Sequence, residues 1–349
     1  MHLRISHQIS VGVFLLSALI LPACATSIEN QGSYRIAKKI KLGGDGGWDL
    51  LAIDSGTHHL YVSRATRVMV VDVDEGKQIA EIPDTPGVHG IALAPELGKG
   101  FITCGKVDSV KVFDLKTNSI LATIPVGKGP DAIFYEPLTR HVFVFNHKGK
   151  SVSVMDANAN QIIKTIDLGG QPEIGVADDH GTIFVNLEDT SEVVVLDGHD
   201  LIVRSRRPLA PGKEPTGLAI DTKNRRLFSG CANRLMVVTD ADTGKVLGTA
   251  PIDSDVDGAA FDPETGLIFC SSREGTVTLI KETPPHFSVI QTLPTQKGSK
   301  TMVLDAKTHN AYLPAAEFGT APAPTPENPH SRPPVLPGTF QILVAGPEP

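Results

Sequence analysis

Cysteine is scarce in this chain, and its spacing matches none of the common cysteine motifs. The 349 residues include four cysteines, Cys24, Cys104, Cys231 and Cys270, with no CxxC pair and no CxxCH segment. The three cysteines after Cys24 are too few to cross-link a chain of this length into a disulfide scaffold. The missing motifs also exclude covalent haem attachment and a zinc site built on paired cysteines. We therefore expect these three residues to be small buried side chains on strands.

Basic runs and catalytic signatures are missing as well. The 32 Lys and Arg residues are interspersed with 39 Asp and Glu residues, which leaves a formal net charge of −7. Proteins that bind a nucleic-acid backbone typically carry a basic stripe, so no nucleic-acid partner is indicated. The sequence contains no G-x-S-x-G elbow, no phosphate-binding loop and no dinucleotide fingerprint. The common motifs of hydrolases and nucleotide-binding enzymes are therefore absent.

The first residues have the features of an export signal. Arg4 precedes an apolar stretch, Ile9 to Leu21, that is shorter than the roughly 20 residues a membrane-spanning helix needs. Leu21-Pro22-Ala23-Cys24 resembles a lipobox, which would make Cys24 the lipidated N-terminus, whereas Ala23-Cys24-Ala25 fits ordinary signal peptidase. We favour the lipoprotein interpretation, with residues 1–23 removed. Both interpretations predict a protein of the periplasm, outer membrane or cell surface, with a membrane contacted only through the lipid.

One sequence repeat, a pattern of short strands and turns, recurs seven times along the rest of the chain. Each copy has a strand led by an aromatic residue, at Tyr61, Phe101, Phe143, Phe184, Phe228, Phe269 and Tyr312. Their spacings are 40, 42, 41, 44, 41 and 43 residues. Twelve residues before each aromatic, or eleven in the fourth copy, lies a matched position, occupied by Asp49, His89, Asp131, Glu173, Thr216, Asp257 and Lys300. A period near 40 with four short strands per unit is typical of β-propeller blades.

The repeats predict an all-β fold, a single seven-bladed propeller over residues 34–344 with four-stranded blades. In the third copy, Val-, Ile- and Phe-rich segments place strands at 132–135, 141–145, 151–155 and 162–166. Residues 34–43 match the fourth strand of other copies but precede the first complete copy, so we expect them to close the ring in blade seven. Residues 315–338 interrupt that blade with a proline-rich insertion, and because proline lacks a backbone donor we expect a structureless loop there.

Three segments carry a family resemblance. "LYVSRATRVMVVD" at 60–72, "TIPVGKGPDAI" at 123–133 and "TIDLGGQPEIGV" at 165–176 resemble the repeat and the blade joints of the YVTN-repeat, or YncE-like, β-propellers exported by bacteria. The resemblance covers residues 34 to about 313, although Ser63 and Arg64 replace the Thr and Asn of the name motif. It implies the fold and an exported protein, and it transfers no activity because the family has no common catalytic motif.

Propeller geometry indicates where a binding site would lie. The seven matched positions begin the innermost strands, so we expect Asp49, His89, Asp131, Glu173, Thr216, Asp257 and Lys300 to ring the mouth of the central channel on one face, called here the top face. Trp48 adjoins this ring, and loops of the same face contribute Arg64, Asn146 and Arg273. The expected partner is a small molecule or an envelope protein, bound by a monomer.

The ring also suggests a cation site. Asp131 and Glu173 are neighbours with no basic ring residue between them, and His89 lies next to Asp131. Adjacent carboxylates share a proton or hold a cation, so these three are our predicted metal ligands, with Ca²⁺ as the candidate ion. A hydrated channel entrance without a metal is the competing interpretation. We expect a non-catalytic binding module, with a metal-dependent hydrolase or lactonase and a quinoprotein-like electron-transfer protein as alternatives.

Overall fold

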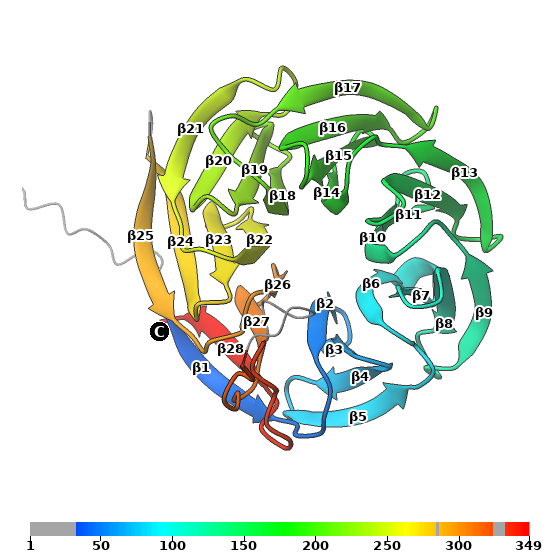
Figure 1. The fold of residues 1–349 in the computed structure, drawn as a ribbon, viewed down its shortest axis with the longest axis vertical. Coiled ribbons are helices and arrows are strands. Elements are labelled where there is room, and N and C mark those ends of the chain that lie inside the picture. Colours follow the sequence, from blue (N-terminus) through cyan, green and yellow to red (C-terminus); the bar gives the residue numbers. More distant parts are fainter. Residues whose placement is uncertain (1–32, 284–285, 324–331, 349) are drawn as a thin grey trace, which may run out of the picture. The chain divides into compact units, whose positions relative to one another are not determined.

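The computed structural model describes residues 33–283, 286–323 and 332–348, and these form a seven-bladed propeller. Within them, 28 strands build seven four-stranded antiparallel sheets arranged in a ring around a central axis (Figure 1). In blades one to six the first strand lies nearest the axis and the last lies on the rim, and in blade seven β26 is innermost and β1 outermost. The predicted fold class is confirmed. No helix in the described part of the chain has the length and apolar character that crossing a bilayer requires.

In blades one to six, the strands follow one another along the chain from the innermost to the rim. Blades one to three comprise β2 Trp48–Asp54, β3 His59–Arg64, β4 Arg67–Asp72, β5 Lys77–Ile82; β6 Val88–Ala94, β7 Lys99–Cys104, β8 Ser109–Asp114, β9 Ile120–Pro125; β10 Pro130–Glu136, β11 His141–Asn146, β12 Ser151–Asp156, β13 Gln161–Asp167. Blades four to six comprise β14 Pro172–Ala177, β15 Thr182–Leu187, β16 Glu192–Asp197, β17 Ile202–Pro208; β18 Pro215–Asp221, β19 Arg226–Cys231, β20 Leu235–Asp240, β21 Val246–Pro251; β22 Val256–Asp262, β23 Leu267–Ser272, β24 Thr276–Thr283, β25 His286–Pro294. A short 3-10 turn, η1 Pro95–Leu97, joins β6 to β7.

Blade seven is completed by the N-terminal strand. Its sheet has the order β1 (Tyr34–Lys41), β28 (Gln341–Pro347), β27 (Asn310–Ala315) and β26 (Val303–Asp305). The strand β1 pairs with β28 over its whole length, from Tyr34 opposite Pro347 to Lys41 opposite Gln341. The sequence-based prediction of ring closure is therefore confirmed, and two edges that would otherwise be exposed are paired.

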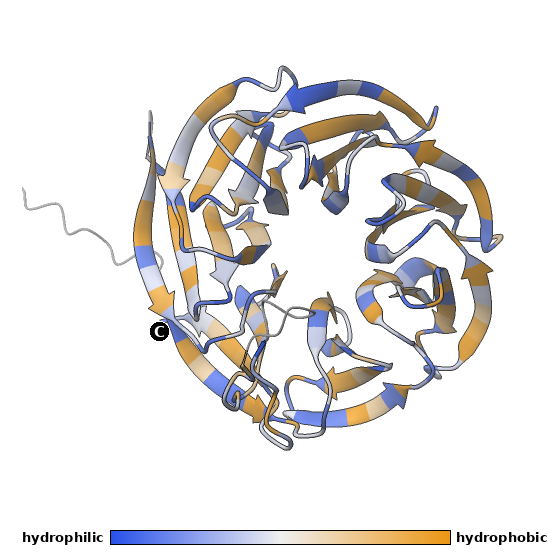
Figure 2. Ribbon diagram, in the orientation of Figure 1, coloured by the Kyte–Doolittle hydropathy of each residue, from blue (hydrophilic) through white to orange (hydrophobic). Residues whose placement is uncertain are grey.

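The core consists of apolar clusters that bridge neighbouring blades. The leading aromatics of all seven repeats are buried, and Phe143, for example, packs with side chains of both blade three and blade four. The second and third strands of each blade are enclosed on both faces, so they are nearly continuously apolar. Figure 2 shows this for β16, whereas polar residues colour much of β17 on the rim. Cys104, Cys231 and Cys270 are buried within these strands, as expected.

A bulge recurs in the outermost strand of every blade. The register of each outer pair skips one residue, namely Ala37, Ile79, Leu121, Ile163, Arg204, Leu247 or Ile290. The five Ile and Leu residues of this set are among the exposed large hydrophobic side chains. A bulge twists an edge strand and prevents straight pairing with another chain. The rim is therefore protected from edge-to-edge association despite its apolar side chains.

The proline-rich insertion of blade seven is paired where the structure describes it. An isolated bridge joins Phe318 to Val335, and the Gly319 amide donates to the carbonyl of Pro334 at 2.8 Å. The ring of Phe318 packs against Trp48, with centroids 6.0 Å apart. The expectation of a structureless loop is wrong for these flanks, because backbone pairing and aromatic packing hold them. Residues 324–331 lie outside the described residues.

Candidate functional site

A second, inner set of bulges presents the ring residues to the channel. In blades one to five, two residues of the first strand lie opposite one residue of the second, and the ring residue is the first of the two. In blade six the pairing passes from Val256 to Gly258, so the ring residue Asp257 has no residue opposite it on the second strand. A β-bulge redirects a side chain relative to a regular strand. The repeated spacing in the sequence thus corresponds to a repeated backbone irregularity at the channel mouth, which the sequence did not reveal.

Hydroxyl groups of two second strands, and that of Thr301 just before β26, hold this irregular backbone. The Thr103 hydroxyl accepts from the Gly90 amide and donates to the Asp131 carbonyl of the next blade, both at 2.7 Å. Ser271 donates to the Lys300 carbonyl at 2.6 Å, and Thr301 donates to the Asp49 carbonyl at 2.7 Å. These contacts join neighbouring blades at the ring positions. The mouth is therefore a rigid surface rather than a set of free loops.

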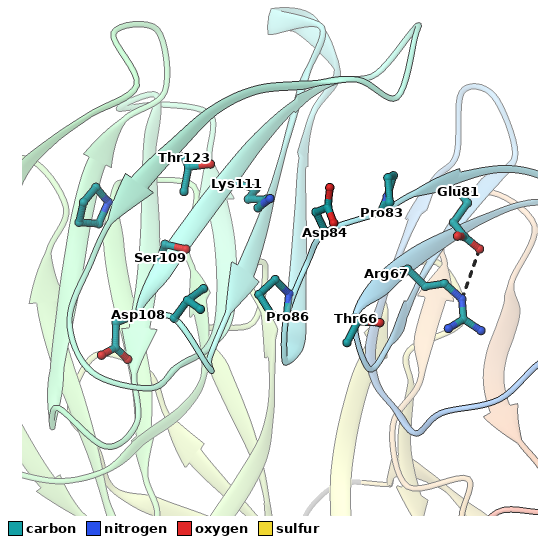
Figure 3. Close-up of a pocket in the computed structure, with 12 residues that line it drawn as sticks. Thr66, Arg67, Glu81, Pro83, Asp84, Pro86, Asp108, Ser109, Lys111 and Thr123 are labelled. Atoms are coloured by element: carbon teal, nitrogen blue, oxygen red, sulfur yellow. Dashed lines mark ion pairs between the residues drawn. The ribbon is translucent and has the colours of Figure 1, made fainter.

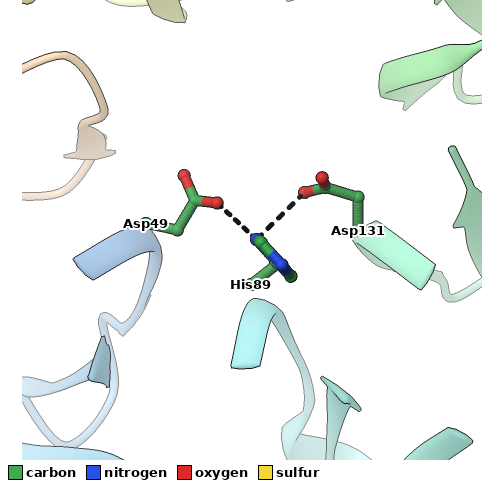
Figure 4. A group of neighbouring side chains, drawn as sticks. All are labelled: Asp49, His89 and Asp131. Carbon is green, nitrogen blue, oxygen red and sulfur yellow. Dashed lines mark hydrogen bonds and ion pairs between the residues drawn. The ribbon is translucent and has the colours of Figure 1, made fainter. Parts of the chain in front are cut away.

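One charged network around Asp49 joins residues of five blades. His89 Nδ1 lies 2.7 Å from Asp49 Oδ2 and 3.8 Å from Asp131 Oδ1 (Figure 4). Lys300 Nζ lies 3.3 Å from Asp49 Oδ1 and also forms an ion pair with Asp257. Lys300 therefore neutralises part of the negative charge of its two ring neighbours. Asp131 is left with the weakest compensation, because its nearest cationic partner in the described structure is beyond hydrogen-bond distance.

The pKa values in this network follow from burial and pairing. Burial opposes ionisation of Asp49, but the hydrogen bond from His89 and the charge of Lys300 outweigh it and lower the pKa of Asp49. The pKa of His89 is raised by the same hydrogen bond. Burial and the neighbouring Asp49 raise the pKa of Asp131. Asp131 is thus a carboxylate that ionises at a cost, which an additional cation would offset.

A second network surrounds Glu173. His147 Nδ1 lies 2.8 Å from Glu173 Oε1, and His147 Nε2 lies 3.9 Å from Glu188 Oε2. Burial raises the pKa of Glu173 to about 7, although the close contact with His147 opposes this rise. The same contact with Glu173 raises the pKa of His147 to about 9. Glu188 was missed by the sequence reasoning, since it follows β15 in the loop after that strand and its spacing matches no ring position.

The three predicted metal ligands do not form one cluster. His89 and Asp131 group with Asp49, whereas Glu173 groups with His147 and Glu188, and each group offers three ligand atoms within 4.8 Å of one another. The blade-three loop places His147 against Glu173, which the linear order of the ring positions did not anticipate. Each group pairs one imidazole with two carboxylates. This is too few oxygen ligands for Ca²⁺, which takes six to eight, and closer to a zinc donor set.

Two residues expected at the mouth are instead buried in the framework. Arg64 is 0% exposed, and its guanidinium donates to the carbonyls of Gly46 and Asp45 at 2.6 and 2.7 Å. Asn146 is also buried and donates to the hydroxyls of Ser151 and Ser153. The expectation that Arg64 and Asn146 line the mouth is therefore wrong. Arg64 and Asn146 are the last residues of β3 and β11, and their side chains are buried against backbone carbonyls and hydroxyl groups.

The remaining predicted residues have partners within the protein. Trp48 packs between Phe318 and Phe340, so it supports the blade-seven insertion rather than offering a free stacking surface. Arg273 Nε lies 2.6 Å from Asp255 Oδ2. The Thr216 hydroxyl donates to the carbonyl of Val256 in the next blade. Among the described residues, the mouth is thus defined chiefly by Asp49, His89, Asp131, Glu173, Asp257 and Lys300, with His147 and Glu188 added by the loops.

A partly open pocket of about 160 Å³ lies next to the ring positions. Its walls come mostly from residues that follow a ring position by one or two places, namely Leu50, Leu51, Ile91, Ala132, Ile133, Ile174, Gly175, Gly258, Ala259 and Met302. Phe145 and the ring residue Asp257 complete the lining. The pocket therefore adjoins the mouth through Asp257, and most of the side chains that line it are apolar.

A larger groove of about 780 Å³ lies nearer the rim, between blades one and two. Its lining includes Arg67, Glu81, Asp84, Asp108 and Lys111 (Figure 3). Arg67 Nε lies 3.3 Å from Glu81 Oε2, and Asp108 accepts from the Gly129 amide at 2.8 Å. Charges of both signs line this groove and two of them are internally paired. It presents no convergent set of groups comparable with that of the channel mouth.

Comparisons with known proteins confirm the fold and leave the family open. No family model and no curated protein matches the sequence. A chain of Kuenenia stuttgartiensis hydrazine synthase is similar in structure, with 16% identity, a TM-score of 0.69 and coverage of 77% of this chain and 92% of that chain. A chain of the mitotic checkpoint complex is also similar, with 13% identity, a TM-score of 0.71 and coverage of 87% of this chain and 95% of that chain. The WD40 β-propeller domain of Doa1 has 13% identity, a TM-score of 0.70 and coverage of 90% of this chain and 97% of that chain. At these identities the likeness establishes the propeller alone.

Proposed function

We propose that this chain is an exported propeller of the YVTN-repeat type that acts as a non-catalytic binding module of the cell envelope. We further propose that its ligand presents a cationic group to the channel mouth. The rigid ring and the absence of known catalytic motifs support a binding role. Export rests on the N-terminal sequence, which lies outside the described residues, and the YVTN assignment rests on the repeat motifs.

The observation that carries this proposal is the excess of carboxylates at the mouth. Five carboxylates converge there, from Asp49, Asp131, Glu173, Glu188 and Asp257, and face one lysine and two imidazoles. Each of the two imidazole pKa values is raised, so the site already takes up protons to reduce its negative charge. A bound cation would serve the same purpose, and the partly buried site would strengthen the attraction.

The test is a titration of the purified protein with methylammonium and, separately, with Ca²⁺ at low ionic strength, followed by calorimetry. Low salt is needed because ions screen charges at a partly open mouth. We expect binding of at least one of the two cations, and roughly tenfold weaker binding by Asp131→Asn and by Glu173→Gln. A matched control is Glu264→Gln, since Glu264 is 78% exposed on the opposite face and should leave binding unchanged.

The proposal fails if neither cation binds, or if the control weakens binding as much as the mouth variants. Calcium that is present stoichiometrically and survives dialysis would instead favour the metal-dependent hydrolase or lactonase. The small number of oxygen ligands in each cluster argues against that outcome.

A further inference from the structure

His147, Glu173 and Glu188, called here the His147 group, lie together without a lysine or arginine. In the described part of the chain, the two carboxylates of this group form ion pairs only with the imidazole of His147. The group around Asp49 differs, because Lys300 Nζ supplies a positive charge 3.3 Å from its carboxylate. A divalent cation would be repelled by that lysine, whereas nothing comparable opposes it at the His147 group. Of the two groups, the His147 group is therefore better suited to a metal ion.

The contact between His147 and Glu173 is short, but it is not a hydrogen bond. His147 Nδ1 lies 2.8 Å from Glu173 Oε1, yet this nitrogen is buried and has no hydrogen-bond partner. A buried polar atom without a partner costs free energy and indicates that a partner is missing. Two ligand atoms of one metal ion have this relation, because each directs its lone pair at the ion and not at the other atom. A metal ion would supply the partner that this nitrogen lacks.

The spacing of the three side chains suits one small ion. One ligand atom from each side chain lies within 4.8 Å of the other two. Zinc bonds to nitrogen and oxygen are about 2.0–2.2 Å long, which places the ligand atoms of a tetrahedral ion roughly 3.4 Å apart. Small side-chain movements would bring the three atoms to this separation. An imidazole with two carboxylates suits zinc and related transition metals, whereas Ca²⁺ takes about six to eight oxygen ligands.

We propose that His147, Glu173 and Glu188 bind one divalent transition-metal ion of the zinc class. His147 comes from the loop after β11 in blade three, whereas Glu173 lies in β14 and Glu188 follows β15, both in blade four. A bound ion would therefore cross-link two neighbouring blades at the mouth. Three protein ligands leave at least one coordination position for water or for a ligand of the mouth. The site goes beyond the proposed function, because it requires no ligand with a cationic group and rests on contacts of its own.

The experiment is a calorimetric titration of the purified, tag-free protein with Zn²⁺, and with Ca²⁺ and Mg²⁺ for comparison. We expect one Zn²⁺ per chain, bound more tightly than either of the other ions. Replacing a group that only orients a metal ligand weakens metal binding about 10–100-fold, so losing a ligand in His147→Ala or Glu188→Gln should weaken Zn²⁺ binding at least about tenfold. The matched control is Glu274→Gln, because Glu274 is exposed in the corresponding loop of blade six and should leave Zn²⁺ affinity unchanged.

Two further measurements locate the ion. Zn²⁺ should raise the melting temperature of the wild type but not that of His147→Ala, because only the folded ring brings the two blades together. Co²⁺ in place of Zn²⁺ should give visible absorption without the intense near-ultraviolet band of a cobalt–thiolate bond, since the three cysteines of the described residues are buried. A thiolate band would assign the metal to a cysteine and overturn the proposal.

Equal Zn²⁺ affinity of the wild type and His147→Ala would contradict the metal site, and so would Ca²⁺ or Mg²⁺ bound as tightly as Zn²⁺. If His147→Ala does not fold, Glu188→Gln decides, because Glu188 is a partly exposed loop residue. Methylammonium binding without Zn²⁺ binding overturns the metal site alone. Zn²⁺ binding without methylammonium or Ca²⁺ binding supports the metal site and overturns the proposed function. The absence of binding by all three overturns both.

Discussion

Replacing Arg64 by methionine tests whether this arginine anchors the closing joint of the ring. The guanidinium of Arg64 donates to the Gly46 and Asp45 carbonyls in the loop between β1 and β2, and it lies 3.7 Å above the ring of Phe340 beside β28. One side chain thus connects the N-terminal segment, blade one and the end of the chain. Methionine keeps much of the apolar stem and removes the charge and the donors.

The expected loss of stability follows from these contacts. Two charge-assisted hydrogen bonds contribute about 1.5–3 kcal/mol each, and a desolvated cation–π contact contributes about 2 kcal/mol. Burial lowers the pKa of Arg64 to about 10, which corresponds to a cost of about 3 kcal/mol that the substitution removes. Subtracting this burial cost from the summed contributions of the contacts predicts that Arg64→Met destabilises the protein by about 2–5 kcal/mol. For a domain of this size, that lowers the melting temperature by roughly 3–8 °C.

The assay is urea and thermal unfolding of Arg64→Met beside Arg67→Met. Arg67 bonds to the same loop, at 3.1 Å from the Asp45 carbonyl, but its side chain is 20% exposed and pairs with Glu81 near the surface. Its replacement should cost less than about 1 kcal/mol. Equal stability of the Arg64 variant and the wild type would refute the reasoning. If the Arg64 variant were as stable as the wild type but no longer bound cations, Arg64 would have a role in binding rather than in stability.

Four further predictions concern the mouth, the closure and the N-terminus. In Glu173→Gln the pKa of His147 should fall by about 1–2, which NMR titration of the imidazole measures; an unchanged value would show that another group raises it. Because the folded-state pKa of Glu173 is raised to about 7 and that of His147 to about 9, wild-type stability should decrease as the pH rises from about 4.5 to 9, and Glu173→Gln should show a flatter profile in unfolding measurements. Deletion of residues 33–43 removes β1 and should destabilise the whole ring, so thermal unfolding at the wild-type temperature would contradict closure by this strand. We expect mass spectrometry to find Cys24 acylated, and a free N-terminus at Thr26 would instead support a soluble periplasmic form.

The sequence by itself determined the blades, their order and their closure. Repeats of similar length must adopt similar local structures, so the spacing of aromatics such as Phe143 and Phe184 was enough to count the blades. The unmatched segment at 34–43 could pair only where a strand was missing. The ring positions followed from the same spacing, because each lies at a constant distance from a buried aromatic on the next strand.

The tertiary structure alone decided which side chains meet at the mouth. Loops from blades three and four bring His147 and Glu188 to Glu173, while the equally polar Arg64 and Asn146 turn inward to satisfy backbone carbonyls and hydroxyls. Spacing records the position of a residue along a strand, and it does not record the direction of a loop side chain or a bulge in the backbone. Those depend on hydrogen bonds between blades, such as that from Thr103 to Asp131, which form only when the ring is assembled.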